Sequence, residues 1–117
     1  MRKKYNPLRN YKHFKKEYLY FVVFVRCGDV YYTFDADAKI MMYYFDKYRC
    51  EQSFMISKEK FNKVLRLLLS NGINVTLTGW KNAREYYSNK PNDYIRIRTK
   101  SKNWYKEKTK GLGDYYE

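Results

Sequence analysis

The side chains best suited to chemistry are cations interleaved with aromatic rings near both ends of the chain. Near the C-terminus, four alternating cations are followed by two aromatic residues: Arg96, Arg98, Lys100, Lys102, Trp104 and Tyr105. The N-terminal group is Arg2, Lys3 and Lys4. Guanidinium and ammonium groups neutralise phosphates, and aromatic rings stack on unpaired bases. The pattern predicts nucleic-acid binding; the alternative is an edge strand whose charges only prevent aggregation.

No set of side chains predicts catalysis. His13 is the single histidine. As a general base it would need an orienting carboxylate and a nucleophile, and only Glu17 lies one helical turn away. Gly111 and Gly113 follow no expected strand, so they do not indicate a dinucleotide site. We therefore expect no enzymatic activity.

Metal and cofactor binding are not expected either. Asp29, Asp35 and Asp37 lie close together in the sequence and could hold a divalent cation. Each also has a structural explanation: Asp29 in a turn, Asp35 as a helix cap, and Asp37 in the first turn of that helix. Cys27 and Cys50 are too far apart in the sequence to indicate zinc. We expect both to be free thiols.

Composition and charge point to one domain with an acidic partner. The 117 residues are 44% hydrophobic and 21% aromatic, which suffices for a packed core. The formal net charge is +13. Residues 1–20 carry +6 and residues 81–117 carry +5, whereas residues 21–80 carry only +2. Such a field favours nucleic acid, an anionic membrane or an acidic protein as partner.

The longest apolar run covers only residues 18–25, which is short of the roughly 20 residues that a membrane span needs. The basic N-terminus is followed by no small-residue cleavage site, so it does not predict a secretory signal. We expect a cytoplasmic protein that does not bind membranes.

Apolar periodicity predicts an α/β fold, a mixed β-sheet flanked by helices. The expected strands are residues 18–26, 30–34, 50–56, 73–78 and 94–99. The first is apolar on both faces, so we place it at the centre of the sheet. The expected helices are residues 11–17, 35–48, 57–72 and 81–87. Residues 1–100 would form the domain, with Arg96 and Arg98 on one face of its last strand, and residues 101–117 a basic, flexible tail.

The order of motifs resembles domain I, the N-terminal domain of MutS mismatch-repair proteins, from about residue 5 to residue 79 and onward to about residue 100. That domain has a proline-led helix, an apolar strand, a GDFYEMF-like segment and a DAK-containing helix. The matching segments here are Pro7-Leu8, the strand at 18–26, Gly28-Asp29-Val30-Tyr31-Tyr32-Thr33-Phe34 and Asp37-Ala38-Lys39. Further on, Gly72-Ile73-Asn74-Val75-Thr76-Leu77 corresponds to the family's glycine-led strand.

This sequence departs from the family where the family reads mismatches. A Phe-x-Glu motif meets the mismatched base there, the Phe by stacking and the Glu by a hydrogen bond. The corresponding positions are Val30, which has no ring, and Tyr32, which has no carboxylate. The resemblance implies that these positions face nucleic acid without reading mismatches. We interpret Tyr31 and Phe34 as packing residues.

No G-x-x-x-x-G-K-[ST] phosphate loop occurs in the sequence, so no ATPase of that type is expected. We expect a stand-alone MutS domain I-like protein, of a kind a mobile element could carry, that binds nucleic acid, DNA first, by electrostatics. The alternative is a protein-interaction or inhibitor module, from a mobile element or a repair pathway, that docks on an acidic partner. The sequence leaves the oligomeric state and the preferred form of nucleic acid open.

Overall fold

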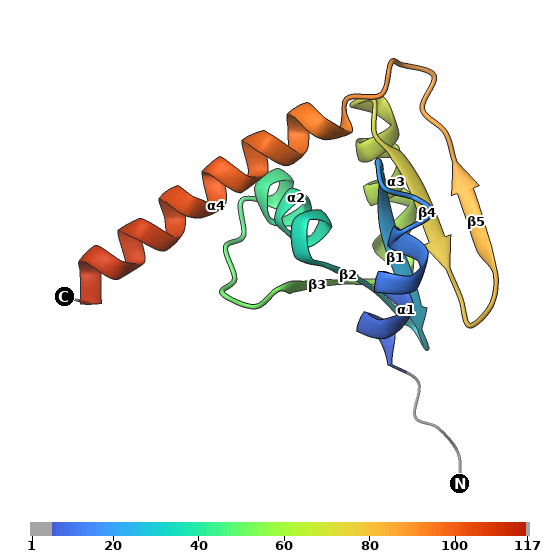
Figure 1. Ribbon diagram of the computed structural model, residues 1–117, viewed down its shortest axis with the longest axis horizontal. Coiled ribbons are helices and arrows are strands. Elements are labelled where there is room, and N and C mark those ends of the chain that lie inside the picture. Colours follow the sequence, from blue (N-terminus) through green and yellow to red (C-terminus); the bar gives the residue numbers. More distant parts are fainter. Residues whose placement is uncertain (1–5, 117) are drawn as a thin grey trace, which may run out of the picture.

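The computed structural model describes the backbone of residues 6–116 and the side chains of residues 6–111. Its sheet has five strands in the order β3-β2-β1-β4-β5 (Figure 1). The strands are β1 Phe21–Cys27, β2 Val30–Phe34, β3 Ser53–Ser57, β4 Asn74–Thr78 and β5 Ala83–Tyr86. The helices are α1 Pro7–Lys15, α2 Asp35–Phe45, α3 Phe61–Ser70, which follows the 3-10 turn η1 Lys58–Lys60, and α4 Tyr94–Tyr116.

The predicted mixed sheet and its central strand are confirmed. β1 pairs with β4 in parallel, and the other neighbouring strands are antiparallel. All four side chains from Val22 to Val25 are fully buried, because helices cover both faces of β1. Val22 and Phe24 belong to the larger core, whereas Val23 and Val25 belong to the smaller one.

The two faces of the sheet carry different helices. α1 alone covers the first face, where Tyr11 and Phe14 pack on Val23 and Val25. α2 and α3 cover the opposite face, and α4 packs along α2 and projects from the sheet (Figure 1). α1 begins four residues before the start predicted at residue 11 and ends at Lys15, because Pro7 is its first residue and the Asn6 side chain caps it by accepting from the Arg9 N–H at 3.2 Å.

Left-handed backbone occurs at the two glycines that end elements. Gly28 has φ +64° in the turn between β1 and β2, which is the turn in which Asp29 was expected to lie. Gly72 has φ +78° after α3, and a Cβ there would lie 2.6 Å from the Pro91 carbonyl oxygen. Cys27 and Cys50 are free thiols, which confirms the expectation for them.

Three predictions about the C-terminal part are wrong. The segment predicted as a helix at residues 81–87 contains β5, which pairs with the edge of β4 and places Tyr86 against the core. The predicted strand at 94–99 is the start of α4, because Tyr94, Ile97 and Ser101 form its buried stripe while Ile95 is 53% exposed. The irregular tail predicted after Lys100 is helical through Tyr116. None of the described helices is long and apolar enough to cross a membrane.

Candidate nucleic-acid interface

A pocket with three cations lies between α2, α4 and the residue before β3. Its volume is about 410 Å³, and we call it the basic pocket. Its described lining consists of Asp35, Ala36, Lys39, Gln52, Arg98, Thr99, Ser101 and Lys102. Lys39, Arg98 and Lys102 outnumber the one acidic side chain, Asp35. The pocket is therefore suited to an anion such as a backbone phosphate.

Helical spacing on α4 places the cations. Arg98 and Lys102 are four residues apart and share a face of the helix, and Lys106 continues the same stripe by one more turn. The rise of about 1.5 Å per residue puts about 6 Å between successive members of the stripe, which a run of phosphates can follow.

Aromatic rings hold two of the pocket's cations in place. The Arg98 guanidinium carbon lies 5.5 Å from the centre of the Tyr94 ring, and Lys39 Nζ lies 4.7 Å from the centre of the Tyr105 ring. A cation–π contact occupies one side of the cation and leaves other N–H groups available to donate to an anion. Lys39 was not among the sequence-predicted site residues; its position in the Asp37-Ala38-Lys39 motif is the signal that could have found it.

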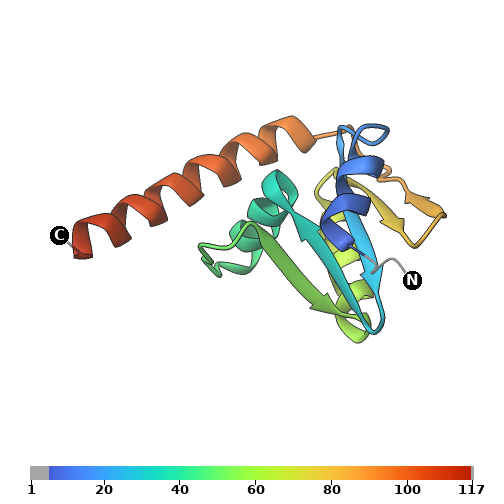
Figure 2. The same ribbon diagram turned by 60° about the horizontal axis from the view of Figure 1, so that its bottom comes forward.

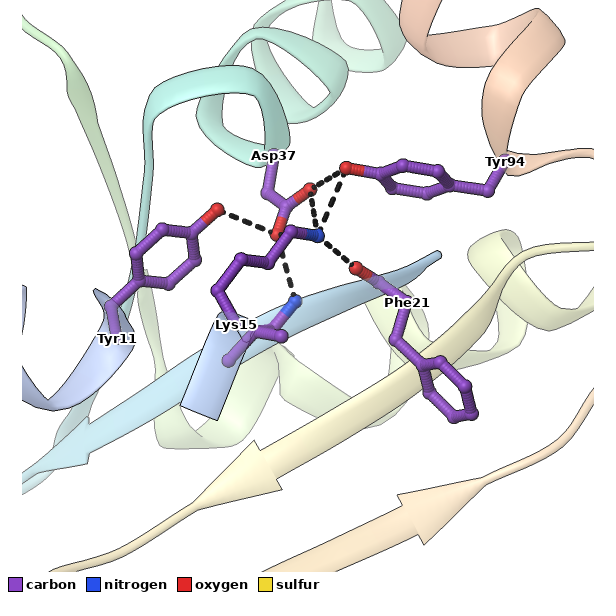
Figure 3. Close-up of polar contacts among 6 residues, drawn as sticks. Tyr11, Lys15, Phe21, Asp37 and Tyr94 are labelled. Atoms are coloured by element: carbon purple, nitrogen blue, oxygen red, sulfur yellow. Dashed lines mark hydrogen bonds and ion pairs between the residues drawn. The ribbon is translucent and has the colours of Figure 1, made fainter. Parts of the chain in front are cut away.

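A buried carboxylate fixes the elements that carry the pocket. Asp37, on α2, is fully buried and accepts from Tyr11 Oη at 2.8 Å, the Val23 N–H at 3.0 Å and Tyr94 Oη at 2.6 Å. Lys15 Nζ lies 3.1 and 3.0 Å from its two oxygens (Figure 3). We call these five residues the Asp37 cluster. It joins α1, β1, α2 and α4 at one point.

The electrostatics of the Asp37 cluster follow from its burial. Desolvation, reinforced by the Asp37 charge, raises the pKa of Tyr11 and of Tyr94 far above the ordinary tyrosine value. Desolvation also lowers the pKa of Lys15, although the Asp37 charge opposes that shift. Lys15 Nζ further donates to Tyr94 Oη at 2.9 Å and to the Phe21 carbonyl at 2.5 Å. Because both carboxylate oxygens are saturated with donors, the cluster has a structural role.

The three carboxylates considered for metal binding have separate surroundings. Asp37 is committed to its cluster, and Asp35 lines the basic pocket. Asp29 lies in the turn between β1 and β2, where its backbone carbonyl accepts from the Lys58 N–H at 3.0 Å, and no group of three possible metal ligands occurs among the described residues. The prediction that Asp35 caps α2 is wrong. The N-cap residue is Phe34, which makes no side-chain capping hydrogen bond, and Asp35 is the first residue of the helix, with φ +53°.

Val30 and Tyr32 occupy alternate positions of β2 together with Phe34, which packs in the core under α1, so they lie on the face of the sheet that carries α1. In Figure 2, β2 and β3 lie uncovered between α1 and α4. Both side chains are half-buried, and their neighbour Met55, opposite Tyr32 on β3, is 49% exposed. The Tyr32 ring stacks on Phe34 with centroids 6.0 Å apart and planes 14° apart, so one of its faces is already covered.

The prediction that Arg96 and Arg98 share a face is wrong. Residues two apart on a helix point about 200° apart, whereas on a strand they share a face. Arg96 lies on the far side of α4 with Lys100, and its guanidinium pairs with Asp93. This hydrogen bonding holds the pKa of the Asp93 carboxyl below its usual value. Of the C-terminal predictions, only Arg98 and Lys102 meet in the pocket.

The Trp104 ring packs between two helices. Trp104 is half-buried between α2 and α4, where its ring meets Tyr43 with centroids 6.2 Å apart and Lys108 Nζ lies 5.7 Å from its centre. The ring therefore packs two helices together and does not stand free for a base.

Arg2, Lys3 and Lys4 lie outside the described residues. α1 and its C-cap residue add exposed cations: Arg9, Lys12 and Lys16.

The chain is thus a small α/β domain with a five-stranded mixed sheet, one face of which is only partly covered. The family model for MutS domain I matches residues 6–101. Because this match covers most of the chain, the protein belongs to the MutS domain I family. No match was found among curated proteins.

Proposed function

We propose that the domain binds nucleic acid, with DNA as the favoured kind, by electrostatic contacts with the backbone and without catalysis. The observation that carries the proposal is the convergence of Lys39, Arg98 and Lys102 on one pocket of a chain whose net charge is +13. Backbone contacts of this kind position a nucleic acid and carry little sequence information. The exposed cations of α1 and the stripe that continues to Lys106 would extend the contact.

We further propose that the domain does not read mismatches as its family does. β2 places Val30 and Tyr32 on one face, which is the arrangement a Phe-x-Glu motif would have. Val30 offers no ring to stack on a base, and Tyr32 offers no carboxylate to accept from one. Matched and mismatched duplexes should therefore bind within about tenfold of each other, which is about 1.4 kcal/mol. A larger preference in a fluorescence anisotropy titration would show that another side chain reads the mismatch.

The test of the basic pocket uses two variants with equal charge. The Arg98→Gln/Lys102→Gln variant removes two cations from the pocket, and the Arg96→Gln/Lys100→Gln variant removes two from the opposite side of α4. Affinity for a 20-base-pair duplex is measured between about 50 and 200 mM salt. Each phosphate contact contributes about −0.9 to the log–log slope.

We expect the pocket variant to make the log–log slope less negative by up to about 1.8 and the control variant to leave the slope nearly unchanged. Equal reductions would mean that DNA responds only to the overall field, and the pocket would lose its role. Absence of binding at low salt would overturn the proposed function itself. Circular dichroism checks that both variants fold: Arg96, Lys100 and Lys102 are exposed charges, which contribute little to stability, and Arg98 is half-buried over the Tyr94 ring.

A further inference from the structure

A second groove lies beside the edge strand β3. Its volume is about 390 Å³, and we call it the edge groove. An apolar floor comes from α2, β3 and α3: Phe45, Phe54, Ile56, Val64 and Leu67. The Phe45 side chain is 39% exposed, although it stacks on Phe54 with ring centroids 6.1 Å apart. This is a partly exposed apolar surface that the basic pocket does not include.

The rim of the edge groove is entirely basic. Its charged lining residues are Lys47, Arg49, Lys60 and Lys63, and none of the described lining residues is acidic. Residues 21–80 carry only +2 overall, so four cations around one groove are a local concentration. An occupant that complements this groove carries carboxylates beside apolar side chains.

The backbone of β3 adds a third recognition element. Within the described residues, no strand pairs with β3 on the side away from β2. The Asp35 N–H donates to the Gln52 carbonyl at 2.9 Å and the Lys58 N–H to the Asp29 carbonyl at 3.0 Å. Ladder bonds alternate along an antiparallel strand, so the N–H and C=O of Met55 point away from β2 toward the open edge. They are placed to pair with a further strand.

We propose that the edge groove binds an extended, acidic peptide segment of a protein partner, which adds to the sheet as a strand beside β3. Every second side chain of such a strand points to the same face, so apolar residues at alternate positions would fill the groove floor. Carboxylates at other alternate positions, on the same face of the strand, would meet the rim cations, of which Arg49 lies over the ring of the floor residue Phe54. The length of β3 sets a contact of about five residues.

The same features disfavour a nucleic acid as the occupant. Base stacking needs an open ring face. Phe54 is covered by Phe45 and by the Arg49 guanidinium, whose central carbon lies 5.7 Å from the ring centre. An outward-pointing peptide N–H and C=O pair is matched by another peptide backbone, and main-chain pairing of this kind supplies affinity in strand addition.

The test uses the full chain and a fluorescein-labelled ten-residue peptide, followed by fluorescence anisotropy; every second position carries valine or glutamate in turn, so that both face the groove, and the positions between them are threonine. Two matched peptides serve as controls. One carries N-methyl groups on alternate amides, which removes backbone donors while keeping every side chain. The other has lysine in place of glutamate, which reverses the charge. We expect each control peptide to bind at least tenfold more weakly than the acidic one.

Protein variants locate the site. Lys60→Glu/Lys63→Glu reverses two rim charges, and Lys12→Glu/Lys16→Glu makes the same change of net charge on the exposed side of α1. Glutamate near the start of α3 complements the helix dipole, so the groove variant should fold. We expect about tenfold weaker peptide binding for the groove variant and less than twofold for the α1 variant.

The results separate this proposal from the nucleic-acid one. Arg98→Gln/Lys102→Gln should leave peptide binding unchanged, and loss of peptide binding in that variant would overturn the edge groove as the site. Equal binding of the N-methylated and unmodified peptides would overturn strand addition. If the groove variant instead loses DNA binding relative to the α1 variant while peptide binding persists, the groove is a nucleic-acid site and the peptide proposal fails.

Discussion

Replacing Asp37 by Asn tests whether the Asp37 cluster holds the domain together. The change keeps the size of the side chain but removes the charge, while Lys15, only 19% exposed at its side chain, stays beside it. An amide also presents N–H₂ to a site where every neighbour donates, so at least the Lys15 ammonium is left facing a donor. Removing one partner of a buried ion pair costs about 3–5 kcal/mol. That is a large part of the about 5–15 kcal/mol that folds a typical domain.

Urea unfolding followed by circular dichroism measures the effect. With a slope of about 2 kcal/mol per molar urea, the midpoint should fall by about 1.5–2.5 M. Lys15→Met should also destabilise, because it leaves the Asp37 charge without its cation. The double variant should be less destabilised than the sum of the two by at least about 1.5 kcal/mol. A cost below about 1 kcal/mol for Asp37→Asn, or additivity within about 0.5 kcal/mol, would refute the reasoning.

Two further predictions concern stability. The free energy of unfolding should fall as pH rises above about 10, because unfolded tyrosines ionise there while the two tyrosines of the Asp37 cluster, with raised pKa values, keep their protons. The lowered pKa of Lys15 has the opposite effect on the free energy of unfolding, and only below about pH 10.4. Equal stability at pH 8 and pH 11 in urea unfolding would contradict the expectation. Gly72→Ala should cost about 1–3 kcal/mol, because it forces φ +78° on an L residue and brings a Cβ within 2.6 Å of a carbonyl oxygen. Gly79→Ala, where nothing lies within 4 Å of the new Cβ, should be nearly neutral in the same unfolding measurement.

The sequence predicted the parts of the fold that rest on local pattern. The unbroken apolar run of β1, the turn at Gly28 and the alternation in β4 each specify an element without reference to the rest of the chain. Residues 94–99 show where local pattern is ambiguous. Ile95 and Ile97 alternate with arginines as in a strand, yet Tyr94, Ile97 and Ser101 have helical spacing, and packing against α2 selects the helix.

The candidate site was less predictable because its geometry is long-range. Asp37 meets Tyr11 and Tyr94 across 26 and 57 positions of the chain, and no periodicity reports such a contact. The basic pocket needs Lys39 from one helix and Arg98 from another. Once residues 94–99 are assigned as a strand, Arg96 and Arg98 are placed together, although the helix separates them.

The parallel pairing of β1 with β4 bears on how the nascent chain folds. β1, β2 and β3 are sequential antiparallel neighbours and can pair as they emerge, but one edge of β1 stays open until Asn74–Thr78 is made. At about 5–20 residues per second, the roughly 50 intervening residues take about 3–10 s. During that time an apolar strand edge is exposed to other chains. A chain ending at Gly72 should therefore aggregate, by light scattering, at concentrations where the whole chain stays dispersed.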